Sequence, residues 1–188
     1  FTFLITGNIN KANHYRIISV LKALKKLIKS HKNVRLLIAG NIEDRDYLEI
    51  KLNKMRINNK VKFIGKFCQL EAPKIYKLAD AYITMTYKDN CPTAVLEAMA
   101  SGLPVIYSAS GGVPELVDHN SGIGLKVQSS WDEVRTPKTN KIINGMIKIM
   151  DNRKSMSESA RTRVCENFDI KFWQKRHELV FNSLLNRL

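Results

Sequence analysis

Two carboxylates, Asp89 and Glu97, lie on either side of the start of a predicted helix. The helix is expected over residues 92–100, with Pro92 at its first position, where the missing N–H costs nothing. The N–H groups of Thr93 and Ala94 would then remain free to face an anion such as phosphate. A carboxylate one or two turns further on can accept hydrogen bonds from a sugar diol. A diphosphate beside a diol is the shape of a nucleotide-sugar.

The elements around these carboxylates predict an α/β fold. Short apolar runs alternate with helical periodicity, which is typical of a parallel sheet covered on both faces. Strands are expected at residues 1–6, 34–39, 61–64, 79–85, 103–107 and 123–127. Helices are expected at residues 14–29, 44–57, 71–77, 92–100 and 112–118, and in the tail at 140–150, 155–167 and 170–188.

This pattern predicts one domain over residues 1–188, a Rossmann-like doubly wound parallel sheet of about six strands with a helical tail at 137–188. Ligands of such sheets bind beyond the carboxyl ends of the strands. Residues 89–92 follow the fourth expected strand and therefore lie at that edge. The chain begins with an apolar run and has no initiator Met, so we expect a segment to precede residue 1.

The composition argues against several classes of site. Cys68, Cys91 and Cys165 are far apart and form no C-x-x-C pair, which argues against a disulfide framework or a zinc site and favours a reducing compartment. The four histidines are equally scattered. No metal ligand set and no cofactor are therefore expected. No apolar run approaches the roughly 20 residues of a membrane span.

The positive charge is concentrated in the first part of the chain. The net charge is +14, and residues 1–77 hold 17 of the 31 Lys and Arg but 5 of the 17 Asp and Glu. A positively charged first part of the chain could bind nucleic acid, an anionic membrane or a phosphorylated substrate. A solvated lysine-rich surface explains the same charge without any partner. No helix-turn-helix, RNA-recognition or zinc-finger pattern is present, which argues against nucleic acid.

Two longer motifs follow the carboxylates, E-A-M-A-S-G-L-P-V-I at residues 97–106 and S-G-G-V-P-E-L-V at 110–117. Three landmarks precede them in order, I-A-G at 38–40, V-K-F-I-G at 61–65 and I-Y-K-L-A-D-A at 75–81. Together they resemble glycosyltransferase family 4, the "group 1" transferases of the GT-B fold. The resemblance covers residues 1–130 clearly and the tail loosely.

The resemblance implies the C-terminal, donor-binding half of a two-domain enzyme, whose N-terminal acceptor domain is absent from this chain. It also implies retaining transfer of a sugar from a UDP-, GDP- or ADP-sugar to an acceptor hydroxyl on a glycan, lipid or protein. Without the other domain this fragment is not expected to be active. The expected location is cytoplasmic. The lysine-rich helix at 14–29 could touch the anionic inner face of a membrane, although a solvated sheet-covering helix explains it as well.

The same resemblance assigns roles to residues of the motif. Asp89 takes the place of the first Glu of the family's E-x7-E and would contact the donor sugar. Glu97 takes the place of the second Glu and would hold the ribose hydroxyls. Backbone groups at Asn90, Cys91, Pro92 and Thr93 would assist at the sugar, and Lys66 and Phe67 would meet the nucleobase.

The chain departs from the family where an Arg and a Lys usually bind the diphosphate. Asn8 occupies the first position, and Ala12 or Asn13 the second. Neutral Asn brings no charge, so Lys11 is the preferred substitute and Arg16 the alternative. A third interpretation is a weak or inactive enzyme that serves as a nucleotide-sugar-binding scaffold. Cys91 at a helix start could suggest a nucleophile, but no His lies near it in sequence.

Overall fold

The protein contains a parallel six-stranded sheet. A computed structural model describes residues 1–186. The strands are β1 (Thr2–Thr6), β2 (Arg35–Ala39), β3 (Val61–Gly65), β4 (Ala81–Thr84), β5 (Val105–Ala109) and β6 (Gly122–Lys126). They hydrogen-bond in the order β3-β2-β1-β4-β5-β6, and all five pairings are parallel. This order reverses direction between β1 and β4, which is where ligands of doubly wound sheets bind.

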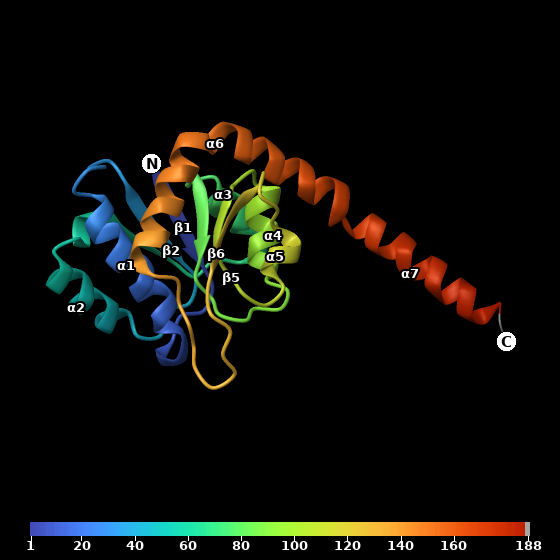
Figure 1. Cartoon of the computed structure of the whole chain (residues 1–188), viewed down its shortest axis with the longest axis horizontal. Helices are drawn as coiled ribbons and strands as arrows, with labels where there is room; N and C mark the ends of the chain where they lie inside the picture. The colour runs from blue at the N-terminus through green and yellow to red at the C-terminus, as the bar shows by residue number, and fades with distance from the viewer. Residues whose placement is uncertain (187–188) are drawn as a thin grey trace.

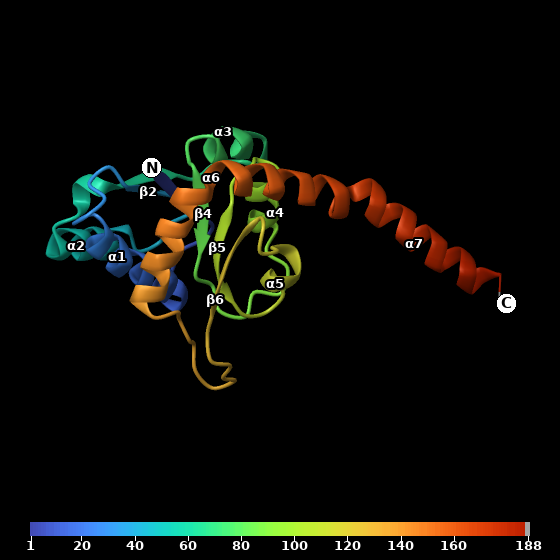
Figure 2. The same cartoon turned by 45° about the horizontal axis from the view of Figure 1, so that its top comes forward.

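Helices cover both faces of the sheet (Figures 1 and 2). They are α1 (His14–Leu27), α2 (Arg45–Met55), α3 (Ala72–Tyr76), α4 (Thr93–Ala100), α5 (Val113–Leu116), α6 (Thr139–Asn167) and α7 (Ile170–Leu185). Side chains alternate along β1, so Phe3 and Ile5 pack under α1 and the first part of α6, while Leu4 packs on the side of α4 and α5. The expected α/β architecture is confirmed.

The tail agrees with the sequence prediction. The helices expected at 140–150 and 155–167 are the two parts of α6, which meet at a kink at Asn152, where the backbone is not helical (φ −115°, ψ 18°). The helix passes over the sheet edge near the amino ends of the strands (Figure 2), so Ile142 lies in one core and Ala160 in the other. One helix can therefore cover both faces, which local periodicity does not reveal. Of the helix expected at 170–188, residues 187–188 lie outside the described residues.

Asp118 helps to join α6 to the loop after α5. Its Oδ1 accepts hydrogen bonds from the Ser121 hydroxyl (2.5 Å) and from the backbone N–H of Ser121 (2.9 Å), and its Oδ2 lies 3.3 Å from Arg163 Nη1. Burial raises the pKa of the Asp118 carboxyl, but these bonds and the Arg163 charge outweigh it, so the pKa lies below its ordinary value.

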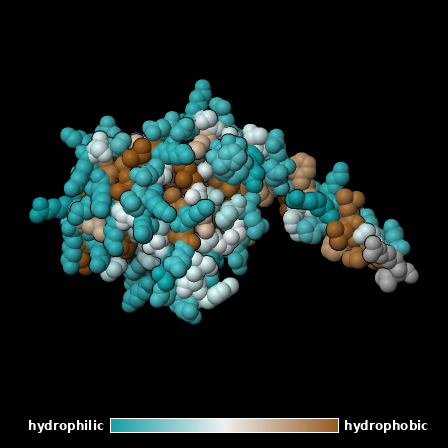
Figure 3. Space-filling model, in the orientation of Figure 1, coloured by the Kyte–Doolittle hydropathy of each residue, from teal (hydrophilic) through white to brown (hydrophobic). Residues whose placement is uncertain are grey.

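The last helix, α7, projects away from the body as an arm (Figure 1), and no side chain within Ile170–Leu185 is buried. Apolar side chains gather along it (Figure 3), including Phe172, Trp173, Val180 and Phe181, each about half exposed or more. Among the described residues, no helix is both long and apolar enough to cross a bilayer.

Candidate functional site

A cavity of about 440 Å³ opens at the carboxyl ends of β1, β2 and β3. It contains four of the predicted site residues, Asn8, Lys66, Phe67 and Glu97. The complete lining is Thr6, Gly7, Asn8, Gly40, Asn41, Lys66, Phe67, Tyr76, Ala94 and Glu97. The loop after β1, the loop after β3 and one face of α4 therefore converge here, although they are up to 90 residues apart in sequence.

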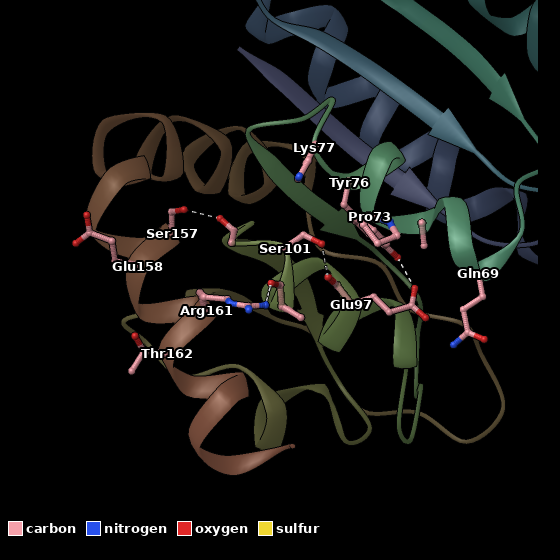
Figure 4. A pocket seen from close by; sticks show the side chains of 13 residues that line it. Gln69, Pro73, Tyr76, Lys77, Glu97, Ser101, Ser157, Glu158, Arg161 and Thr162 are labelled. Carbon is pink, nitrogen blue, oxygen red and sulfur yellow. Dashed lines mark hydrogen bonds between the residues drawn. The ribbon is translucent and has the colours of Figure 1, made fainter. Parts of the chain in front are cut away.

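Glu97 is held in place from beneath by a buried tyrosine. The Tyr76 hydroxyl donates a hydrogen bond to Glu97 Oε2 (2.9 Å; Figure 4). It also lies 3.3 Å from the Ala94 carbonyl oxygen and 3.4 Å from the Thr6 hydroxyl. Thr6 also contacts the Tyr82 hydroxyl at 3.0 Å. Burial raises the pKa of Tyr76, so the phenol stays neutral and remains a donor. This network leaves Glu97 Oε1 without a hydrogen-bond partner in residues 1–186.

Glu97 also lies at the rim of a larger cavity of about 870 Å³ (Figure 4). Residues of α3, α4 and α6 line that cavity, including Lys77, Ser157 and Arg161. Within residues 1–186, Glu97 is the only predicted site residue in its lining. The smaller cavity, at the carboxyl ends of the strands, is therefore the better candidate, because it brings the predicted residues together at the edge where ligands of such sheets bind.

The loop that carries Asp89 and Asn90 packs directly against two glycines. The Gly112 N–H donates to the Asp89 carbonyl (2.8 Å). A Cβ on Gly111, whose φ is +66°, would lie 2.3 Å from the Asp89 oxygen, and one on Gly112 would lie 1.8 Å from the Asn90 oxygen. Either contact is shorter than real Cβ atoms make, so both positions require glycine. The close neighbour of this glycine pair in the structure is therefore the loop of Asp89 and Asn90.

The start of α4 differs from the prediction by one residue. Pro92 has extended backbone angles (φ −73°, ψ 106°) and caps the helix, so Thr93 is the first helical residue. The turn closes by a bond from the Val95 N–H to the Pro92 carbonyl (3.0 Å). In the described part of the chain the N–H groups of Thr93 and Ala94 donate to no acceptor. Cys91 is exposed beside them, and neither it nor Pro92 and Thr93 lines the cavity.

Asn13 uses its side chain within its own loop. Its Oδ1 accepts from the Asn10 N–H (3.0 Å), and its Nδ2 donates to the Asn8 carbonyl (3.0 Å). These bonds close the short 3₁₀ turn Lys11–Asn13 that precedes α1. The predicted donor-binding side chain of Asn13 is thus occupied by local hydrogen bonds, which a count of spacing from the strand could not show.

Lys11 and Arg16, the two alternative cations, lie in different surroundings. Lys11 is exposed on the 3₁₀ turn and does not line the cavity. Arg16 reaches back from α1, where its Nη2 donates to the Asn8 carbonyl (2.6 Å) and its Nη1 lies 3.5 Å from the Thr86 hydroxyl. Its Nε is buried without a hydrogen-bond partner in residues 1–186.

The Trp131 side chain is 91% exposed, in the loop that joins β6 to α6 and projects beyond the carboxyl edge of the sheet (Figure 2). The Lys88 ammonium lies 3.4 Å from the centre of its ring. No apolar periodicity marks this loop, so nothing in the sequence distinguished a covered from an exposed Trp. Among the described residues, no three His, Cys, Asp or Glu side chains lie close enough together to hold a metal.

Two curated proteins are similar to this chain over most of its length. An uncharacterized glycosyltransferase of Methanocaldococcus jannaschii is 32% identical over 174 residues, covering 89% of this chain and 42% of that protein. N-acetyl-alpha-D-glucosaminyl L-malate synthase of Bacillus anthracis is 26% identical over 171 residues, covering 90% of this chain and 42% of that protein. The chain thus spans less than half the length of these curated relatives.

Solved structures share the fold at low identity. The pneumococcal O-GlcNAc transferase GtfA, in complex with UDP and GlcNAc, superposes with a TM-score of 0.76 at 18% identity, covering 98% of this chain and 36% of that chain. Anabaena HepE, in complex with UDP and glucose, gives a TM-score of 0.74 at 19% identity, covering 97% and 48%. These likenesses confirm the Rossmann-like α/β fold.

The family is established by a match over most of the sequence. The model of the family "glycosyl transferases group 1" matches residues 2–163 of the 188. That span includes all six strands, the cavity residues and most of α6. The chain belongs to the group 1 glycosyl transferases.

Proposed function

We propose that this chain is the donor-binding domain of a retaining family 4 glycosyltransferase, and that a UDP-, GDP- or ADP-sugar binds across the carboxyl edge of its sheet. The observation that carries the proposal is the Glu97 carboxylate, which lies in the cavity with one oxygen fixed by Tyr76 and the other free. UDP in the solved complexes of GtfA and HepE supports the same ligand class.

The cavity suggests how the nucleoside binds. A ribose diol offers two O–H donors, and Glu97 retains acceptor capacity for them because Tyr76 uses only one of its oxygens. Lys66 and Phe67, on the loop after β3, also line the cavity. The nucleobase is assigned to these two residues. Asn8, on the loop after β1, completes this part of the lining.

The sugar is assigned to the loop between β4 and α4. Asp89 is half-buried there, and the free N–H groups of Thr93 and Ala94 lie at the positive end of α4. As the glycosidic bond breaks, the leaving diphosphate gains charge, and donors fixed in advance stabilise it best. No metal or other cofactor is assigned a role. Transfer to the acceptor hydroxyl requires groups outside this chain, so the domain alone is assigned binding and not turnover.

Calorimetric titration of the chain with UDP, GDP and ADP tests the binding proposal. Glu97→Gln removes the charge, and a hydrogen bond to a charged group contributes about 1.5–3 kcal/mol, so affinity should fall about 10- to 100-fold. The matched control is Glu115→Gln on α5, an exposed carboxylate that does not line the cavity. It should bind as the wild type does.

A 2′-deoxy diphosphate sharpens the same test. The wild type should prefer the ribonucleotide by about tenfold, because the deoxy analogue loses one donor to Glu97. Glu97→Gln should bind the two ligands nearly equally. Absence of binding to every nucleotide would refute the proposal, and salt-sensitive binding of an oligonucleotide without nucleotide affinity would replace it with a nucleic-acid function.

A non-catalytic nucleotide-sugar scaffold is the second candidate, because Asn8 is neutral and Asn13 is bonded within its own loop. The two candidates share the binding prediction and differ in turnover. Sugar transfer or donor hydrolysis by the full-length protein favours the enzyme. Donor binding without either reaction favours the scaffold.

A further inference from the structure

Arg16 is a partly buried cation that meets neutral oxygens only. Its two contacts are the Asn8 carbonyl (2.6 Å) and the Thr86 hydroxyl (3.5 Å), and its Nε is buried without a partner. Within residues 1–186, no carboxylate oxygen lies within the 4.0 Å of an ion pair. Burial lowers the pKa of the guanidinium, and the charge of Asp89, near but not paired, opposes this. A guanidinium in such surroundings is stabilised by an anion that the chain itself does not supply.

The position of this guanidinium is informative. Asn8 follows β1 and Thr86 follows β4, and these two strands are the neighbours between which the sheet order reverses. Arg16 thus bridges the two strand ends at the switch point, where doubly wound sheets bind their ligands. It also lies in the first turn of α1, where helix N–H groups and the helix dipole favour negative charge.

Access to the guanidinium from the cavity depends on Gly7. This residue lines the cavity, and a Cβ placed on it would lie 3.4 Å from Arg16 Nη2. No side chain therefore stands at position 7 between the ligand and the charge. Arg16 itself lies behind Gly7 and does not line the cavity; within residues 1–186 the one cation that does is Lys66, on the loop after β3.

We propose that Arg16 binds the diphosphate of the donor and thereby replaces the cations that Asn8 and Asn13 do not provide. This inference rests on the proposed nucleotide-sugar binding. It reverses the preference for Lys11. Neither side chain lines the cavity, but Lys11 is exposed on the 3₁₀ turn, whereas the Arg16 guanidinium contacts Asn8 and Thr86 at the switch point and lies directly behind Gly7. Two N–H groups of one guanidinium can bind two phosphate oxygens at once, which a lysine cannot do.

The test separates phosphate recognition from nucleoside recognition. The best-binding base is first identified with UDP, GDP and ADP, and its nucleoside, monophosphate and diphosphate are then titrated into wild type, Arg16→Gln and Lys11→Gln. Arg16→Gln should weaken the diphosphate about 10- to 100-fold and leave the nucleoside unchanged. Lys11→Gln, which removes an exposed cation of equal charge, should change each affinity by less than about threefold.

Arg16→Lys provides a second variant if the glutamine disturbs folding. It keeps the charge but loses the paired donors, so its diphosphate affinity should lie between those of wild type and Arg16→Gln. Equal loss of nucleoside and diphosphate affinity in both variants would overturn the inference, since it would indicate a structural role. The inference would also be overturned if Lys11→Gln weakened diphosphate binding and Arg16→Gln did not. In both cases the proposed function survives, whereas wild type that binds no nucleotide refutes both proposals.

Discussion

Gly112→Ala is expected to displace the loop that carries the proposed sugar contacts. The added Cβ would lie 1.8 Å from the Asn90 carbonyl oxygen, which is backbone and cannot rotate away. Gly112 has a φ of −89°, an angle that alanine adopts freely. The effect of the substitution is therefore steric, without a contribution from backbone strain.

The size of the effect follows from the overlap. Ordinary contact begins at 3.4 Å, so the carbonyl or the glycine turn must move by about 1.6 Å. Overpacking of this kind costs about 1–3 kcal/mol. In a domain of this size that corresponds to a fall of about 2–12 °C in the melting temperature. Replacing the glycine also stabilises by up to about 1 kcal/mol through the unfolded chain. This gain offsets the lower end of the cost range but not its upper end, where an overlap with backbone is expected.

The assay compares stability with two ligands. Thermal unfolding measures the cost of the overlap, and titration compares a nucleoside diphosphate with the matching nucleotide-sugar. A misplacement of about 1 Å can cost about a hundredfold, so the variant should lose the preference for the sugar-bearing ligand more than the affinity for the diphosphate. Asn90→Ala is the control, because it removes an exposed side chain without moving the carbonyl.

Two results would refute this reasoning. A Gly112→Ala variant that melts within a degree of wild type would mean that the loop is not packed against the glycine turn. A destabilised variant with unchanged discrimination between the two ligands would mean that residues 89–90 do not position the sugar.

Three further predictions concern other parts of the molecule. Tyr76→Phe removes the donor to Glu97, so denaturation should show a loss of about 0.5–1.5 kcal/mol of stability and titration should show weaker nucleotide binding. The control Tyr107→Phe loses a hydrogen bond to the Val117 carbonyl, remote from the cavity, and should lower stability alone. The folded pKa of Asp118 lies below its unfolded value of 3.8, so its carboxylate stabilises the fold above pH 3.8, and this contribution is lost as the pH falls through the folded pKa. The melting temperatures of wild type and Asp118→Asn should therefore converge below about pH 4. A difference in melting temperature that stays constant from neutral to acid pH would contradict this. If α1 meets an anionic membrane, replacing the exposed lysines of α1 and of the turn after it by glutamine should abolish sedimentation with phosphatidylserine vesicles at low salt and leave the result with neutral vesicles unchanged; these are Lys22, Lys25, Lys26 and Lys29. Equal sedimentation of wild type and variant would argue for a merely solvated face.

The sequence predicted well what depends on local periodicity. All six strands, and the helices between them, lie within a few residues of their expected positions, because a buried parallel strand is a short apolar run that often ends at glycine. Glu97 is found in the cavity with Lys66 and Phe67 for the same reason: strand order and short connections bring the carboxyl ends together. The difference at Pro92 concerns an element boundary, which local patterns define poorly. The break at Asn152 in α6 lies between the two helices expected at 140–150 and 155–167.

What the sequence did not predict depends on contacts between distant segments. Arg16 lies 70 residues from Thr86, and its direction follows from the packing of α1 on the sheet. Asn13 makes two hydrogen bonds within its own loop, which its spacing from the strand does not reveal. The need for glycine at position 112 arises from a carbonyl 22 residues earlier in the chain. None of these features has a sequence period.

The exposed arm α7 has a thermodynamic consequence. A helix of 16 residues without buried side chains is marginally stable in water. A partner that covered it would therefore both stabilise the helix and remove water from its apolar side chains. Covering Trp173, Phe181 and their neighbours would remove apolar surface from water and lower the heat capacity. The cavity, by contrast, is lined by Asn8, Asn41, Lys66 and Glu97 among its residues, so a nucleotide there would meet many polar groups. The temperature dependence of a binding enthalpy therefore distinguishes a partner that engages the arm from a ligand that fills the site.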